Sequence, residues 1–120
     1  MANILVIDDE ESIRSLLCTI LDEAGYDVRE AVNGRQGLEL YRTRSADLII
    51  TDLIMPEMNG LDLILELTKQ FLNVKVIAMT GEADAEGQLR VAKLLGARQL
   101  FAKPFEMHKL LRAVQYELAH

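Results

Sequence analysis

The sequence contains no long apolar run, no basic start and only one cysteine. No uninterrupted apolar stretch approaches the roughly 18 residues that a membrane-spanning helix needs, so we expect no membrane partner. The first residues carry no basic segment and acids follow soon afterwards, so no signal peptide is expected. Cys18 has no second cysteine with which to form an internal disulfide, which is typical of a reducing compartment, and we expect a cytoplasmic protein.

Positive charge is also scarce. The 13 Lys and Arg residues are outnumbered by 19 Asp and Glu residues, which gives a formal net charge of −6. A nucleic-acid backbone binds basic surfaces, so direct binding to nucleic acid is not expected. Hydrophobic residues make up 50% of the chain and charged residues 27%, a balance that disfavours disorder. Because no linker or low-complexity segment interrupts the 120 residues, we expect one domain that spans residues 1–120.

Strand-like segments alternate with amphipathic segments along the chain. The expected strands are residues 3–7, 27–31, 47–51, 74–79 and 100–102. The segments between and after them have apolar residues at helical spacing, and the last two helices are expected at residues 84–95 and 106–118. The apolar stripe of the first helix comprises Ile13, Leu16, Leu17, Ile20, Leu21 and Ala24.

Glycines mark several of the expected helix boundaries. Gly25 and Gly96 are expected to end the first and fourth helices, and Gly60 to adopt a positive φ before the third. Five successive strand–helix units predict an α/β, doubly wound, flavodoxin-like fold with helices on both faces. Short right-handed crossovers then favour a parallel five-stranded sheet of order 2-1-3-4-5.

Polar residues follow four of the five expected strands. Asp8 and Asp9 follow the first, Asp52 the third, Thr80 the fourth and Lys103 the fifth. Ligands of open parallel α/β sheets bind just beyond the carboxyl ends of the strands, so these side chains are expected to converge. Three carboxylates with a lysine and a threonine are typical of a site for a divalent metal and a phosphoryl group. Without a cation the carboxylates would repel one another and raise at least one carboxyl pKa.

Four segments at these strand ends carry a resemblance to a known family. They are Val6–Glu10, Asp52–Gly60, Met79–Gly81 and Lys103–Phe105. Any one of them occurs by chance in unrelated proteins, whereas all four in this order and spacing are highly specific. Across essentially its whole length, the chain resembles the receiver domain of two-component response regulators, the CheY-like family.

The resemblance implies a role for each matched residue. Asp52 would be the phospho-acceptor, a carboxylate nucleophile that forms an acyl phosphate. Asp8, Asp9 and Asp52 would hold Mg²⁺ together with the backbone carbonyl of Ile54, because Mg²⁺ prefers a few hard oxygen ligands.

Two further residues would contact the phosphoryl group itself. Lys103 would pair with one phosphoryl oxygen, and Thr80 would donate a hydrogen bond to another. In this family the peptide bond that corresponds to Lys103–Pro104 is typically cis, which would direct the lysine into the site.

The implied function is that of a phosphorylation-activated receiver in a two-component phosphorelay. The phosphoryl donor would be a phosphohistidine on a sensor histidine kinase or on a histidine phosphotransfer protein, and water would later remove the group. The chain would then catalyse only its own phosphorylation and dephosphorylation, so we do not expect a conventional enzyme. Phosphorylation would draw Thr80 inward and shift the face built from residues 84–95, 100–102 and 106–118. That face would contact a downstream effector domain or protein, or a second copy in a phosphorylation-dependent homodimer.

Three positions depart from the family pattern or vary within it. The family usually has Tyr or Phe three residues before the lysine, whereas this chain has Leu100 there and Phe101 one place later. Adjacent strand residues point to opposite faces, so we expect Phe101 to serve packing rather than to replace the aromatic switch residue. Ile54 and Glu82 lie two residues after Asp52 and Thr80, where the family places groups near the path of attacking water, so the resemblance implies that they tune the phosphoryl lifetime.

Each polar residue taken alone has an ordinary interpretation. Asp8 and Asp9 could cap the following helix, Asp52 could be a turn residue, and Lys103 a solvated lysine. Taken together, the four residues favour the site.

Other protein classes fit the sequence less well. A haloacid-dehalogenase-type enzyme would carry a second Asp at position 54, and an FMN-binding flavodoxin would need a Ser/Thr/Gly-rich loop after the first strand. A degenerate receiver that acts as a phosphorylation-independent interaction module would normally lack one of Asp52, Thr80 and Lys103. The sequence leaves open the partner kinase, the output, the oligomeric state, and whether the receiver stands alone or belongs to a larger regulator.

Overall fold

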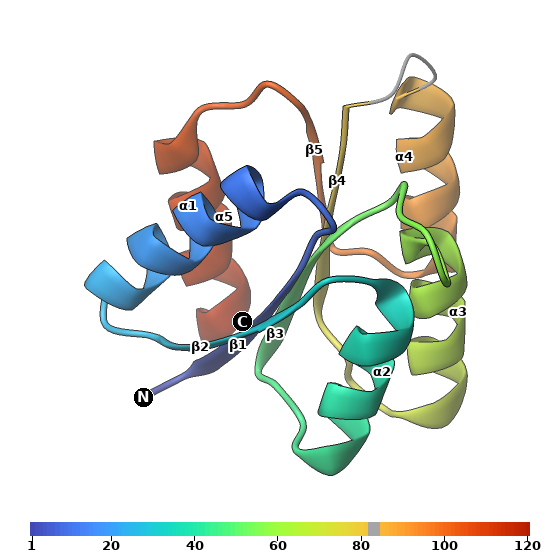
Figure 1. Cartoon of the computed structure of the whole chain (residues 1–120), viewed down its shortest axis with the longest axis horizontal. Helices are drawn as coiled ribbons and strands as arrows, with labels where there is room; N and C mark the ends of the chain where they lie inside the picture. The colour runs from blue at the N-terminus through green and yellow to red at the C-terminus, as the bar shows by residue number, and fades with distance from the viewer. Residues whose placement is uncertain (82–84) are drawn as a thin grey trace.

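Five short strands pair in parallel to form the central sheet (Figure 1). The computed structural model describes residues 1–81 and 85–120. The strands are β1 (Asn3–Ile7), β2 (Asp27–Ala31), β3 (Leu48–Asp52), β4 (Val76–Thr80) and β5 (Gln99–Ala102). All neighbouring pairs are parallel and the order is β2-β1-β3-β4-β5, which confirms the predicted α/β topology.

Helices cover both faces of this sheet. The helices are α1 (Glu11–Glu23), α2 (Gly34–Thr43), α3 (Gly60–Gln70), α4 (Ala85–Leu95) and α5 (Met107–Ala119). Helices α1 and α5 lie on one face, and α2, α3 and α4 lie on the other (Figure 1). Gly25 and Gly96 have φ angles of 96° and 120° and follow the ends of α1 and α4, as predicted.

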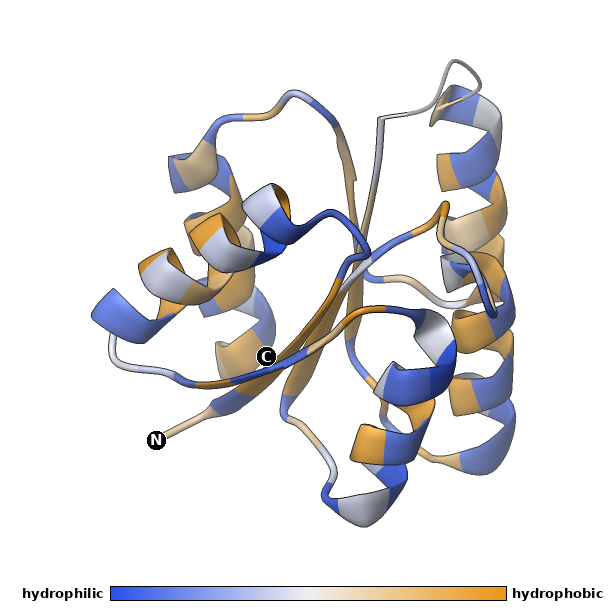
Figure 2. Cartoon of the chain, in the orientation of Figure 1, coloured by the Kyte–Doolittle hydropathy of each residue, from blue (hydrophilic) through white to orange (hydrophobic). Residues whose placement is uncertain are grey.

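Two apolar layers separate the sheet from its helices. Successive residues of β1 alternate between them: Ile4 and Val6 pack with α1 and α5, whereas Leu5 and Ile7 pack with the other three helices. Figure 2 shows the central strands as mostly hydrophobic, whereas each helix combines hydrophobic and hydrophilic residues. Leu17 and Leu21 of the predicted α1 stripe are buried, but Leu16 is 47% exposed, because the stripe is wider than the face that meets the sheet.

Two central strands end one residue later than predicted, at Asp52 and Thr80, and they also begin later, at Leu48 rather than 47 and at Val76 rather than 74. The Leu53 N–H donates to the Met79 carbonyl at 2.9 Å and Asp52 pairs with Met79, so the ladder continues through Asp52. Thr80 likewise pairs with Ala102. Both polar residues therefore end their strands rather than follow them, and the sheet itself sets their positions. Helix α5 begins and ends one residue later than predicted, and the predicted start of α4 at Asp84 lies outside the described residues.

The prediction that Gly60 adopts a positive φ is wrong. Positive φ angles occur earlier in the loop, at Glu57 (50°) and Met58 (80°), and Gly60 is the first residue of α3. A Cβ atom at Gly60 would overlap the Asp52 backbone. Glycine is needed here because α3 starts directly against the end of β3, so a lack of space rather than backbone conformation selects the residue.

Candidate functional site

An acidic cluster forms where β1 and β3 end side by side. Carboxylate oxygens of Asp8, Asp9 and Asp52 all lie within 4.8 Å of one another. Asp8 is fully buried, Asp52 is 7% exposed, and Asp9 is exposed. The strand order places these residues at the predicted edge of the sheet, so their convergence is confirmed.

Lys103 lies between two of these carboxylates. Its Nζ atom is 3.3 Å from Asp8 Oδ2 and 3.2 Å from Asp52 Oδ2, and its side chain is only 17% exposed. The Lys103 N–H donates to the Thr80 carbonyl at 2.8 Å, and the Lys103–Pro104 peptide bond is cis, as the resemblance implied. The alternative interpretation of Lys103 as a solvated lysine is therefore wrong.

The buried charges shift one another's pKa values. Burial raises the pKa of Asp8, and the charge of Asp52 adds to that rise, while the Glu10 N–H and Lys103 oppose it. Burial alone would lower the pKa of Lys103, but Asp52 and Asp8 raise it overall. Three carboxylates and one ammonium group leave two uncompensated negative charges when all are ionised. A divalent cation has the charge that this cluster needs.

The two oxygens of Asp52 face different partners. Oδ1 accepts hydrogen bonds from the backbone N–H groups of Leu53 (2.8 Å) and Ile54 (3.4 Å). Oδ2 faces Lys103. The carboxylate is thereby held in one orientation, and the loop that holds it also carries the Ile54 carbonyl.

Asp8 is held by contacts on both its main chain and its side chain. Its N–H donates to the Ala31 carbonyl at 3.1 Å, and its carbonyl accepts from Arg14 Nη1 at 2.8 Å. Its Oδ1 accepts from the Glu10 N–H at 2.9 Å. The N-cap of α1 is Glu10, so the Asp8 carboxylate bonds the N–H of the N-cap residue and not one of the first N–H groups inside the helix.

Comparison with known proteins agrees with this fold and site. A family model described as the response regulator receiver domain matches residues 4–115. The chain belongs to this family. It is 35% identical over 112 residues to the chemotaxis protein CheY of Thermotoga maritima, covering 92% of each chain. It is 33% identical to the sporulation initiation phosphotransferase F of Bacillus subtilis, covering 93% of this chain and 90% of that protein.

Solved structures and longer relatives give the same family. The receiver domain of the Francisella response regulator 1452 superposes with a TM-score of 0.92 at 28% identity, covering 99% of this chain and 98% of that one. The response regulator TrrA of Thermotoga maritima, solved in complex with Mg²⁺ and BeF, gives a TM-score of 0.87 at 32% identity, covering 98% and 99%. The chain spans only 42% of the transcriptional regulatory protein PhoP of Bacillus subtilis, to which it is 37% identical over 102 residues.

The remaining predicted residues of this receiver lie on the strands β4 and β5. Thr80 is fully buried at the end of β4. Leu100 packs with the α2–α4 layer, whereas Phe101 packs with the α1–α5 layer and its ring centroid is 5.3 Å from that of Phe105. The opposite orientation of these neighbours and the packing of Phe101 are confirmed. Glu82 lies outside the described residues, so its prediction is not tested.

Sequence reasoning missed two buried charged groups. One is Arg14, whose contact with Asp8 is described above. The other is Glu117, a residue of α5 that is 2% exposed and accepts from Gln99 Nε2 at 2.9 Å, with Arg98 Nη1 at 3.6 Å. The sequence did contain a signal for Glu117, because this acidic residue lies beside the apolar residues Val114 and Leu118 in the last predicted helix.

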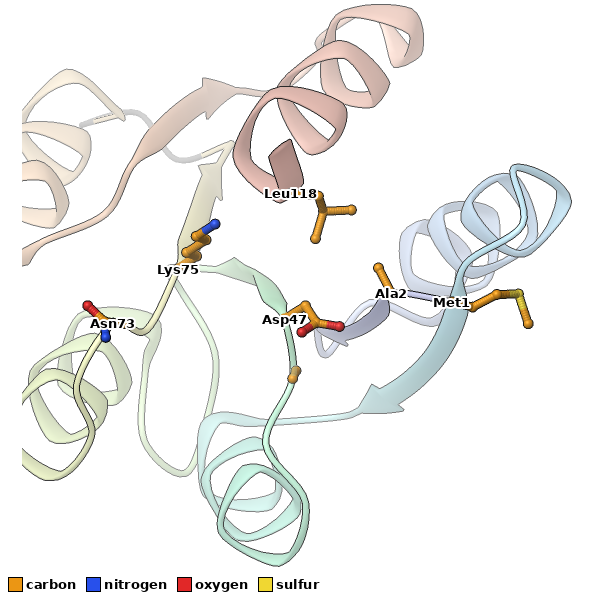
Figure 3. Close-up of a pocket in the computed structure, with 7 residues that line it drawn as sticks. Met1, Ala2, Asp47, Asn73, Lys75 and Leu118 are labelled. Atoms are coloured by element: carbon orange, nitrogen blue, oxygen red, sulfur yellow. The ribbon is translucent and has the colours of Figure 1, made fainter. Parts of the chain in front are cut away.

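A separate hollow of about 500 Å³ lies at the other end of the sheet, near the amino ends of the strands (Figure 3). Its main charged groups already have partners: Lys75 Nζ donates to the Glu117 carbonyl at 2.6 Å, and Asp47 Oδ2 accepts from the Asn3 N–H at 2.8 Å. It contains none of the predicted site residues. Within the described part of the receiver, no helix is long and apolar enough to cross a membrane.

Proposed function

We propose that residues 1–120 act as one receiver unit that is switched by phosphorylation of Asp52. The observation that carries this proposal is the Asp52 carboxylate, on a side chain only 10% exposed, which lies within 4.8 Å of two further carboxylates and 3.2 Å from Lys103 Nζ. A carboxylate oxygen of Asp52 would attack the phosphorus of a phosphohistidine. The bond from phosphorus to the imidazole nitrogen would break, and the imidazole would keep the electron pair and take up a proton. Water would later hydrolyse the acyl phosphate.

The residues present fit Mg²⁺ as the cofactor. Asp8, Asp9 and Asp52 offer hard oxygen ligands with two excess negative charges, and the Ile54 carbonyl lies on the loop next to Asp52. When bound, the ion would supply positive charge that offsets repulsion between two anions. Lys103 already faces Asp52 Oδ2 and would pair with a phosphoryl oxygen, while Thr80 would donate a hydrogen bond to another.

An apolar hollow beside Lys103 supports docking of a protein phosphodonor. It has a volume of about 370 Å³, and its lining includes Ile13 and Leu16 of α1, Phe105 just before α5, and Met107 at the start of α5. Leu16 is 47% exposed although it is apolar. A sensor histidine kinase or a histidine phosphotransfer protein would cover this surface while its phosphohistidine reaches Asp52. This exchange would take place in the cytoplasm, where a lone cysteine such as Cys18 stays reduced.

The output surface would be the face of α4, β5 and α5. Its exposed apolar side chains are Val91 (43%) and Leu94 (81%) on α4 and Tyr116 (53%) on α5. Phosphorylation would draw Thr80 inward and shift this face, which then binds an effector domain, a separate effector protein or a second copy. Since only its own phosphoryl group turns over, the receiver would not act as a conventional enzyme.

Intact mass spectrometry tests the proposal directly. The protein is incubated with Mg²⁺ and acetyl phosphate beside the Asp52→Ala variant and an EDTA control. We expect the wild-type chain to gain the mass of one phosphoryl group, and both controls to gain none. A folded wild-type chain that gains no mass would contradict the proposal and favour the alternative, a degenerate receiver that signals by binding alone.

A further inference from the structure

We propose that Arg14 is a positioning residue that holds the Asp8–Asp9 turn in the geometry needed for metal binding. The inference rests on the proposed function, because it concerns the same acidic cluster. It adds a residue outside the four matched segments, on the first turns of α1, and assigns it a definite effect on metal affinity.

The Arg14 guanidinium joins three elements at the site. Nη1 donates to the Asp8 carbonyl at 2.8 Å, at the end of β1, and Nε donates to Glu30 Oε1 at 2.8 Å, on β2. The Arg14 side chain is only 11% exposed, whereas the side chains of Arg44 and Arg90 are 55% and 70% exposed. Arg14 therefore gives up hydration to make these two bonds, which a solvated surface arginine does not do.

The bond from Arg14 fixes the peptide between two expected metal ligands. The carbonyl that accepts it belongs to the Asp8–Asp9 peptide, so Arg14 restrains rotation of that peptide. Asp8 has further support from Ala31 and Glu10. Asp9 differs: within residues 1–81 and 85–120, no hydrogen bond or ion pair to its carboxylate is found, and only the main chain orients it. Loss of Arg14 is therefore expected to act mainly through Asp9.

The two donors of Arg14 are needed together. A guanidinium presents its donors in a fixed fork, so one side chain can bond the Asp8 carbonyl and the Glu30 carboxylate at once. A lysine ammonium is a compact charge on a flexible stem and would keep the charge without the fork. The Arg14→Lys variant therefore separates the effect of charge from that of geometry.

Metal affinity in the intact chain tests the inference. Mn²⁺, an oxygen-liganded divalent ion, is titrated against the wild type and the variants Arg14→Met, Arg14→Lys and Glu30→Gln, and free Mn²⁺ is followed by electron paramagnetic resonance. We expect roughly tenfold weaker binding in Arg14→Met, the size of effect typical for groups that orient metal ligands. Arg14→Lys is expected to be intermediate, and Glu30→Gln to weaken binding less than Arg14→Met. Arg112→Met, which removes the same charge from an exposed position on α5, is expected to bind as the wild type does.

Two further measurements separate positioning from a merely structural role. Urea unfolding shows whether each variant is folded. Hydrogen exchange of the Asp9 and Glu10 amides in EDTA measures how rigid the Asp8–Asp9 turn is when no metal is bound. We expect faster exchange at these amides in Arg14→Met, and phosphorylation by acetyl phosphate that recovers at high Mg²⁺. If Arg14→Met does not fold, the weaker Mn²⁺ binding expected of Arg14→Lys and Glu30→Gln tests the inference in its place.

The outcomes distinguish this inference from the proposed function. Normal Mn²⁺ binding by the wild type with unchanged binding by folded Arg14 variants would overturn the role of Arg14 alone. Absence of Mn²⁺ binding by the wild-type chain would overturn the metal site, and the role of Arg14 with it.

Discussion

Cys18 illustrates at the residue scale how neighbours set chemical reactivity. It lies half-buried on α1, and burial raises the pKa of its thiol to about 11, with Glu30 adding to the rise and Arg14 opposing it. At pH 8 the thiolate fraction is then about 100-fold lower than for a thiol with the ordinary value of 9.0. We expect iodoacetamide to alkylate Cys18 about 100-fold more slowly in the native protein than in urea at the same pH. Equal rates in a mass-spectrometric time course would contradict this prediction.

Asp8 gives a second prediction at this scale, concerning stability without metal. Its pKa is raised above the ordinary value of 3.8, so the native state binds this proton more tightly than the unfolded state does. This tighter proton binding stabilises the native state fully below pH 3.8, and the stabilisation is lost as the pH rises through the pKa of Asp8 in the native state. At pH 7 the ionised, buried carboxylate therefore costs free energy. An asparagine in place of Asp8 would remove this charge and still accept the hydrogen bond from the Glu10 N–H, while Asp52 would remain as a partner for Lys103.

We therefore expect Asp8→Asn to raise the free energy of unfolding in EDTA by roughly 1 kcal/mol at pH 7. The gain should shrink as the pH falls toward 3.8, because the wild-type carboxyl then becomes neutral. The exposed Asp22→Asn is the matched control and should change little. Urea unfolding that shows Asp8→Asn less stable than the wild type at pH 7 would refute the prediction.

At the element scale, α2 lies directly against the loop between β3 and α3. The Asn33 side chain caps α2 and also donates from Nδ2 to Glu57 Oε2 at 3.2 Å. Gly34, the first residue of α2, has no room for a Cβ because the Met58 carbonyl fills that space. This contact supports the loop whose backbone N–H groups hold Asp52.

The Gly34→Ala substitution tests this contact. Alanine favours helices over glycine by up to about 1 kcal/mol, but the overlap with the Met58 backbone should outweigh that gain. We expect a net loss of roughly 1–3 kcal/mol in urea unfolding. Arg35→Ala, the next residue of α2 and exposed, should change stability far less. A Gly34→Ala variant as stable as the wild type would show that the loop moves aside at little cost.

For the whole molecule, the ends of distant strands must stay together to bind one ion. Binding of Mg²⁺ to the folded state alone should stabilise the entire domain, by about 1.4 kcal/mol at a concentration ten times the dissociation constant. We expect the midpoint of urea unfolding to rise with Mg²⁺ and to fall back when EDTA is added. The Asp8→Asn variant should show no such rise, and an equal rise in that variant would place the ion elsewhere.

The sequence predicted the order of the strands and the residues at their carboxyl ends. Both depend on local signals: short apolar segments, glycines after helices, and polar residues at or directly after the carboxyl ends of strands. Asp8, Asp9, Asp52 and Lys103 could be found in this way, because a parallel sheet brings the ends of neighbouring strands to one edge whatever the details of packing.

Other features depend on contacts between segments that are distant in the chain, and only the tertiary structure decided them. The space at Gly60 depends on how closely α3 approaches β3, and the burial of Glu117 on its contact with Gln99 of β5. Arg14 resembles any surface arginine in the sequence, and its role appears only when Asp8 and Glu30 are brought to its guanidinium. The sequence by itself determined that Asp8, Asp9, Asp52 and Lys103 meet at the site. The packing of α1 against β1 and β2 decided how the Asp8–Asp9 turn is held, because the Arg14 hydrogen bonds exist only once these elements are in place.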